Sequence, residues 1–235
     1  MVYAREIKGE VLTFGHSGKV LRNALVVYDK QTGSLWSQFV GEAVSGPYAE
    51  TPLELLPSMI TTWAAWKLAH PDTLALKQDV MPAFDTYQFY YANSDAGVTG
   101  ETVNDDRLPT KEFVVGFANG EAIMAYPYST LNEEPVINDT VGHVDLVVGF
   151  DAISGTASVF NRSVEGQLLT FSLSGVQDDG YATMQDSQTK STWHALSGKA
   201  ISGQLEGAGL DQLPGHLAYW FAWKDHYPTT KVYGE

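Results

Sequence analysis

The sequence predicts a mainly β fold of the α+β class, with two related β-rich lobes that each carry one amphipathic helix. Three observations lead to this prediction. About a third of the chain aligns with another part of itself, short β-branched and aromatic runs alternate with turn residues, and each aligned copy holds one segment of helical periodicity. Apolar residues make up 44% of the chain and aromatic residues 12%, which is enough for a packed core.

The internal repeat aligns residues 2–76 with residues 159–233 without a gap, an offset of 157 positions. About 26 of the 75 aligned positions are identical, far more than chance would give. A duplicated fold needs its core twice, so residues that both copies share are expected to be structural. The recurring tryptophans are therefore predicted to form the core of the repeats: Trp36, Trp63, Trp66, Trp193, Trp220 and Trp223.

Turn residues and periodicity place the elements within the first copy. Residues 24–38 are predicted to form a hairpin whose turn is Asp29 to Gly33. Apolar residues at helical spacing predict a helix from Pro57 to Ala69, which ends before His70-Pro71. Its two tryptophans are three residues apart and are expected to pack one helical face on a sheet.

Further strands are predicted between the two copies. Residues 113–126 contain two apolar runs joined by Asn119-Gly120, the strongest short-range signal for a hairpin. Residues 144–150 and 156–161 are strands that lead into the second copy. An aromatic and polar stretch at residues 84–95 is interpreted as part of an ordered connector.

The predicted organisation has three parts. Copy 1 comprises residues 1–77, a connector spans 78–110, and residues 111–235 hold copy 2 with the strands that precede it; alternatively, all three form one compact unit. The strands that precede copy 2 have no counterpart ahead of Met1, so copy 1 is expected to be incomplete at its N-terminal side. An unpaired sheet edge there would favour a homo-oligomer or a protein partner.

Charge and composition exclude several classes of function. The formal charge is −14, from 28 acidic and 14 basic residues, which argues against nucleic-acid binding. The chain has no cysteine, which excludes disulfides, thiolate metal sites and cysteine nucleophiles. No run approaches the roughly 20 apolar residues of a membrane span, and the first residues lack the apolar core of an export signal.

The candidate catalytic residues lie in copy 1. His16, Gln38 and Glu42 have no counterpart of the same type in copy 2, and Glu42 forms a candidate carboxylate pair with Asp29. These four residues predict a hydrolytic or metal-assisted enzyme. The alternative interpretation makes Asp29 a turn residue and Glu42 a surface residue.

Evidence for metals and cofactors is weaker. His143 and Asp145 flank Val144, so a strand would turn both side chains to one face, where they could bind a metal or simply face solvent. The chain contains no nucleotide-binding glycine loop, no His-Glu-x-x-His zinc motif and no Gly-x-Ser-x-Gly elbow. No cofactor is therefore predicted.

Several phrases, in order along nearly the whole chain, resemble a bacterial and archaeal family catalogued as domain of unknown function 3179. They are residues 18–47, Asn104-Asp105-Asp106-Arg107-Leu108-Pro109, Ala125-Tyr126-Pro127, residues 136–140 and Trp220-Phe221-Ala222-Trp223. The resemblance implies a Cys-Pro-x-Cys phrase ahead of the segment that matches residues 2–14, which this chain lacks. It also implies a location outside the cytoplasm, and it brings no established reaction.

Three functions remain open from the sequence. The first is a non-catalytic extracytoplasmic binding or assembly module. The second is the enzyme with its site in copy 1. The third is a subunit of a larger complex whose partner completes copy 1, which predicts an exposed sheet edge or apolar patch near residues 1–14.

Overall fold

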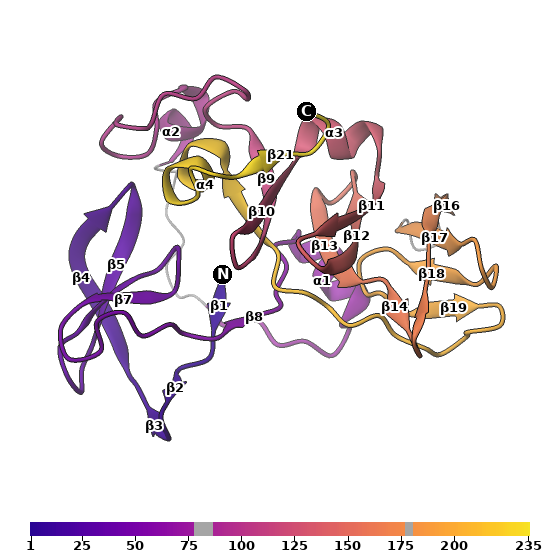
Figure 1. Cartoon of the computed structure of the whole chain (residues 1–235), viewed down its shortest axis with the longest axis horizontal. Helices are drawn as coiled ribbons and strands as arrows, with labels where there is room; N and C mark the ends of the chain where they lie inside the picture. The colour runs from indigo at the N-terminus through magenta and orange to yellow at the C-terminus, as the bar shows by residue number, and fades with distance from the viewer. Residues whose placement is uncertain (78–86, 177–180) are drawn as a thin grey trace.

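The structure, a computed structural model, describes residues 1–77, 87–176 and 181–235. It is β-rich, as the sequence predicts, and its strands form several small sheets instead of one large one (Figure 1). No helix in these ranges is both long and apolar enough to cross a membrane. The helices are α1 (Trp63–Ala69), α2 (Gln88–Ala92), α3 (Tyr128–Glu133) and α4 (Trp220–His226).

Each copy contains a four-stranded antiparallel sheet, and the two sheets lie at opposite ends of the molecule (Figure 1). Both are meanders in which neighbouring strands follow each other along the chain. The copy 1 sheet contains β4 (Phe14–Leu21), β5 (Ala24–Asp29), β6 (Leu35–Ser37) and β7 (Glu42–Ser45). The copy 2 sheet contains β16 (Phe171–Val176), β17 (Ala182–Asp186), β18 (Thr192–His194) and β19 (Ala200–Ser202).

A buried carboxylate organises the central turn of each sheet. In copy 1, Trp36 Nε1 donates to Asp29 Oδ2 at 2.9 Å, and Thr32 Oγ1 donates to the same carboxylate. In copy 2, Trp193 Nε1 donates to Asp186 Oδ2, also at 2.9 Å. A buried carboxylate is stable only when such donors replace its water. The same cluster at the same 157-residue offset supports the predicted duplication.

Two sheets between these ends carry the middle of the chain. The first has the order β20-β9-β10-β21, in which only the β10–β21 pair is parallel. The second is the meander β11-β12-β13. Their bounds are β9 (Phe113–Asn119), β10 (Ala122–Pro127), β11 (Val136–Val141), β12 (Val144–Asp151), β13 (Thr156–Asn161), β20 (His216–Tyr219) and β21 (Lys231–Val232).

The predicted hairpins are present. The two-residue loop between β9 and β10 is Gly120-Glu121, and Gly120 has a φ of +61°, the left-handed conformation that such loops require. The hairpin of β5 and β6 turns through Gly33 with a φ of +73°. Strands β12 and β13 cover the two runs that were predicted ahead of copy 2.

The remaining strands form three two-stranded sheets. They pair β1 (Val2–Tyr3) with β8 (Leu55–Leu56), β2 (Glu6–Ile7) with β3 (Glu10–Val11), and β14 (Ser163–Val164) with β15 (Gln167–Leu168). The pair Tyr3↔Leu55 in copy 1 corresponds by the offset to the bridge Phe160↔Gln212 in copy 2. However, Phe160 also pairs with Val147 of β12, whereas β1 pairs only with β8 within the described ranges.

The core is divided among the sheets, and the tryptophans do not all enter it. Trp36, Trp193, Trp220 and Trp223 are completely buried. Trp63 and Trp66 are 53% and 37% exposed, so the prediction that they are core residues is wrong for both. The physical reason is that, within residues 1–77, 87–176 and 181–235, the sheet that covers α4 has no counterpart over α1.

The helix of copy 1 is also shorter than predicted. It begins at Trp63, six residues after Pro57, because Thr62 is the N-cap and its hydroxyl accepts from Ala65 N at 3.2 Å. Its predicted end is correct, since His70 is the C-cap. The predicted connector contains α2, while its residues 78–86 lie outside the described residues.

The Asp–Trp cluster of copy 2 generates a stability prediction. Burial would raise the pKa of Asp186, but hydrogen bonds from Trp193, Thr189 and Ser191 lower it below its ordinary value. The stabilisation is therefore present above the ordinary aspartate pKa near 4 and is lost as the pH falls below it. We expect Asp186→Asn to lower the free energy of unfolding at pH 7 by roughly 2–3 kcal/mol.

Urea unfolding at pH 7 and at pH 3 measures this effect. The variant should lose less stability than the wild type between the two pH values, because it lacks the titrating carboxylate. The exposed Asp106→Asn is the control and should behave like the wild type at pH 7. Equal stability of Asp186→Asn and Asp106→Asn would contradict the structural role of the cluster.

Candidate functional site

The four predicted catalytic residues of copy 1 are not gathered around one cavity. Asp29 is completely buried, and hydrogen bonds from Trp36 and Thr32 occupy its carboxylate. Glu42 is exposed on β7, and its neighbour Ala43 pairs with Trp36, so the pleat turns Glu42 to the face opposite the Asp29–Trp36 cluster. Asp29 and Glu42 therefore do not face each other.

The other two candidates, His16 and Gln38, do not complete a site with Asp29 or Glu42. His16 is exposed on β4, next to an irregularity in its pairing with β5. Gln38 follows β6, where its backbone N–H donates to Leu25 O at 3.0 Å and its carbonyl accepts from Tyr3 Oη at 3.0 Å. None of the four lines the junction cavity or the cleft described below.

The weak metal candidates occupy different environments. His143 lies in the turn before β12, so it does not share a strand face with Asp145. Asp145 instead accepts from Thr140 Oγ1 at 2.6 Å and lies 3.5 Å from Arg162 Nη2. Among the residues that the structure describes, no three His, Asp or Glu side chains form a group that could hold a metal ion.

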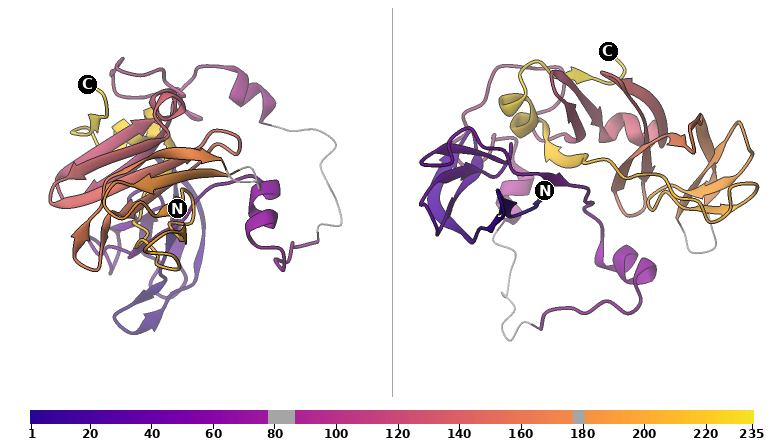
Figure 2. Two further views of the ribbon diagram at one scale, coloured as in Figure 1. Left: turned by 90° about the vertical axis from the view of Figure 1, so that its right-hand side faces the viewer. Right: turned by 60° about the horizontal axis from the view of Figure 1, so that its bottom comes forward.

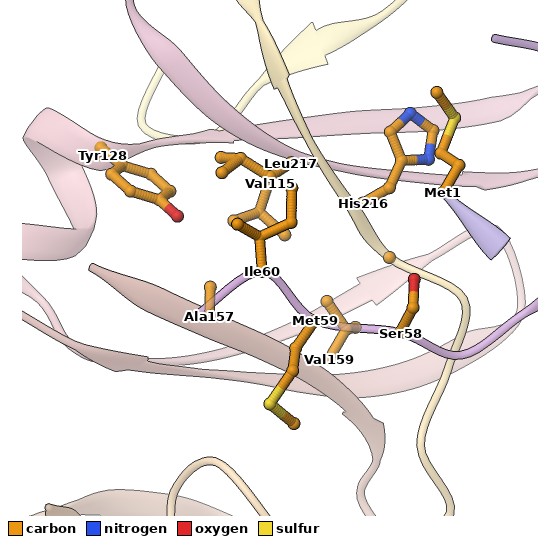
Figure 3. A pocket seen from close by; sticks show the side chains of 11 residues that line it. Met1, Ser58, Met59, Ile60, Val115, Tyr128, Ala157, Val159, His216 and Leu217 are labelled. Atoms are coloured by element: carbon orange, nitrogen blue, oxygen red, sulfur yellow. The ribbon is translucent and has the colours of Figure 1, made fainter. Parts of the chain in front are cut away.

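A small cavity lies at the junction of the two copies (Figure 3). Its volume is about 20 Å³, room for a water molecule but not for an organic substrate. His216 of β20 lines it, and both ring nitrogens of this buried histidine lack a hydrogen-bond partner among the described residues. Burial is the main cause that lowers the pKa of His216 to about 3, so the imidazole is neutral at physiological pH.

A larger and more open cleft of about 540 Å³ lies between the β4–β5 turn, residues 99–103 and α4. Its polar groups are engaged with one another. Asn23 Oδ1 accepts from Thr99 Oγ1 at 2.8 Å, and Asp225 Oδ1 accepts from Thr102 Oγ1 at 2.8 Å. These contacts tie the connector to both copies and leave no converging set of catalytic groups.

The helix of each copy contacts the other copy. Helix α4 of copy 2 contacts the sheet of copy 1, where the ring of Phe39 stacks on His226 with centroids 4.1 Å apart. In turn, Ala65 and Trp66 of α1 share a small cavity with Leu196 of copy 2, the counterpart of Phe39. Tyr181, which directly precedes β17 of the copy 2 sheet, donates a hydrogen bond to Ala65 O. Each helix therefore lies against the sheet of the other copy.

Both helices carry the same internal contacts. Trp66 Nε1 donates to Thr73 Oγ1 at 3.0 Å, and Trp223 Nε1 donates to Thr230 Oγ1 at 2.8 Å. The ring of Trp66 lies 4.0 Å from that of His70, and the ring of Trp223 lies 4.4 Å from that of Tyr227. The local structure of α1 thus matches that of α4 even though its surroundings differ.

The helices differ in what covers their other side. The β9–β10 hairpin covers α4 so closely that a Cβ atom on Gly116 would lie 2.1 Å from the ring of Trp223. Among the residues that the structure describes, no such hairpin covers α1, which stands away from the central sheets (Figure 2). The exposed apolar side chains of α1 and of the segment that precedes it are Ile60, Trp63, Trp66 and Leu68.

Sequence reasoning identified the residues of this surface but assigned them to the core. The repeat alignment treats Trp63 and Trp220 as equivalent, but Trp63 is 53% exposed and Trp220 is completely buried. The pattern of residue types within the helix does not separate them, because the covering of α4 comes from β9 and β10, a distant part of the chain.

The buried histidine at the junction gives a second prediction. The unfolded chain protonates His216 below its ordinary pKa near 6.5, whereas the folded protein does so only near pH 3. Stability is therefore lost as the pH falls from about 6.5, and His216 should account for about 2 kcal/mol between pH 7 and pH 5.

We expect His216→Phe to remove this part of the pH dependence of stability, because phenylalanine does not titrate. The phenyl ring can keep the ring contacts that His216 makes with Phe39 and Trp223. Urea unfolding at pH 7 and pH 5 gives the difference in unfolding free energy for each protein. His143→Phe, at an exposed turn, is the matched control. If the stability of His216→Phe depends on pH as steeply as that of the wild type, the pKa of His216 is the same in the folded and the unfolded chain, and the prediction is wrong.

Comparison with known proteins gives a family but no reaction. No solved structure matches this chain. The family model described as "Protein of unknown function (DUF3179)" matches residues 1–230, which is nearly the whole chain. The chain therefore belongs to this family of unknown function.

Proposed function

We propose that the chain is a non-catalytic assembly module, a subunit in which a protein partner covers α1 of copy 1. One observation carries the proposal. Trp63 is 53% exposed, whereas its counterpart Trp220 is completely buried. The two helices share the hydrogen bond from their second tryptophan to a threonine, Trp66 to Thr73 and Trp223 to Thr230. A surface that is covered in one copy and uncovered in the other is suited to binding.

Energetics support this proposal. Burying a large apolar side chain stabilises a complex by roughly 1.5–3 kcal/mol, and tryptophan is enriched among the residues that dominate interfaces. The polypeptide on both sides of α1 is also apolar, since Ile60 is 58% and Leu74 is 94% exposed. Clusters of exposed apolar side chains on a folded protein mark interaction sites.

The rival functions receive less support. The enzyme hypothesis required His16, Asp29, Gln38 and Glu42 to meet, and their contacts give no shared site. The one-sided pairing of β1 adds an open edge near the N-terminal segment, as the assembly hypothesis expects. A location outside the cytoplasm stays a prediction from the family resemblance.

The proposal predicts a specific cross-link at α1. A photoreactive phenylalanine analogue replaces Trp63 in the full chain, produced in cells of its source, and illumination should yield a discrete product with another protein. The control carries the same analogue at Leu173, an exposed residue of the copy 2 sheet. Mass spectrometry identifies the attached protein. If position 63 gives no product that is absent at position 173, the assembly function is wrong.

A further inference from the structure

We propose that the partner presents a two-stranded β-hairpin of the kind formed by β9 and β10, and that this hairpin inserts beside α1. The inference rests on the proposed assembly function and names the chemistry of the partner. The binding surface, here named the hairpin slot, consists of residues 59–62, the helix α1 and residues 74–75.

Copy 2 shows how such a slot is filled. Strand β20 precedes α4 and pairs antiparallel with β9, with His216 opposite Gly116. Strand β21 follows α4 and pairs parallel with β10, with Val232 opposite Ala125. The β9–β10 hairpin therefore lies between the strand before the helix and the strand after it, in the order β20-β9-β10-β21.

The hairpin slot of copy 1 has the same parts in the same order. By the 157-residue offset, residues 59–62 correspond to β20 and residues 74–75 correspond to β21. Neither segment belongs to a strand. Their backbone groups are thus outside any described strand ladder, and pairing with an added hairpin would be the β-augmentation mode of recognition.

The slot is already formed without the hairpin. The Trp66–Thr73 hydrogen bond ties the helix to the segment that follows it, as Trp223–Thr230 does in copy 2. Thr61 Oγ1 accepts from Thr156 Oγ1 at 2.8 Å, which fixes the segment that precedes the helix. A partner would therefore meet an ordered surface and lose little binding energy to ordering it.

The filled slot also specifies the residues that the hairpin must have. Opposite Trp66 it needs a glycine, because any Cβ at the corresponding Gly116 would enter the ring of Trp223. Beside that glycine it needs small or β-branched apolar residues, like the buried Val114 and Ala125 that pack in the core cluster of α4. Charged side chains at these positions would leave their charges unpaired.

A second copy of this chain is a poor source of the hairpin. In each molecule, β9 and β10 are already paired on both outer edges, by β20 and β21. Val114 and Ala125 are completely buried against α4, so donating the hairpin would open the core of the donor. We assign the hairpin to the protein partner of the proposed assembly and not to a second copy.

The test uses a synthetic peptide with the sequence of residues 111–134 as the probe, added to the full chain. Hydrogen exchange measured by mass spectrometry should slow at residues 59–62, in α1 and at residues 74–75. With peptide at about ten times its dissociation constant, exchange there should slow roughly tenfold, because the amides open only when the peptide leaves. Exchange in residues 216–232 should stay unchanged, because their slot is filled.

The matched control peptide carries Gly116→Val and should give no protection, since its side chain would collide with Trp66. The chain variant Trp63→Ser should weaken binding at least fivefold, whereas Leu173→Ser, which removes an exposed apolar side chain elsewhere, should not. Both positions are exposed, so neither variant removes a core side chain.

Three outcomes would overturn the inference. They are a lack of protection at about 1 mM peptide, equal protection by the Gly116→Val peptide, and a dimer of the chain that Trp63→Ser abolishes. If cross-linking from position 63 still captures a distinct protein, the assembly function stands and only the hairpin is wrong. If that cross-link is absent, the assembly function is wrong, and the hairpin inference that rests on it is wrong as well.

Discussion

The contact between the ring of Trp223 and the backbone at Gly116 is the constraint on which the arrangement of the two copies depends. Because Gly116 has no side chain, the β9–β10 hairpin can pack directly on the ring of Trp223 in α4. The same helix carries His226, whose ring stacks on Phe39 of copy 1. The ring of Trp223 thus contacts both the central sheet, at Gly116, and copy 1, at Phe39. His216 completes this junction, with its ring centroid 5.0 Å from that of Trp223, and stays neutral because it is buried there.

The two copies show how one local structure can serve two surroundings. The buried carboxylates Asp29 and Asp186 have the same donors, and the rings of Phe14 and Phe171 meet Trp36 and Trp193 at the same 5.7 Å separation. These contacts are local, so they form wherever the residues recur. The covering of the helices is not local, because it requires strands from another part of the chain. The copies therefore agree inside each sheet and differ at α1 and α4.

This distinction also explains how much the sequence predicts. The class of fold, the hairpin turns at Gly33 and Gly120 and the end of α1 follow from residue types at short range, and the structure has all of them. The burial of Trp63 could not be predicted in this way, because tryptophan at helical spacing has the same pattern whether or not a sheet lies over it. The failure of His16 and Glu42 to meet Asp29 has a similar origin, since the pleat and the pairing register decide which side chains share a face.

The persistence of α1 without a cover suggests why its surface is suited to binding. A seven-residue helix is too short to be stable by itself in water. Here Thr62 caps its first turn, Thr73 holds the ring of Trp66, and Tyr181 of copy 2 donates to its backbone. Three polar contacts therefore fix a helix whose apolar side faces solvent. Under the proposed assembly function, copy 2 already provides part of this support, so a partner would supply only the covering hairpin, and most of its apolar contact area would contribute to affinity.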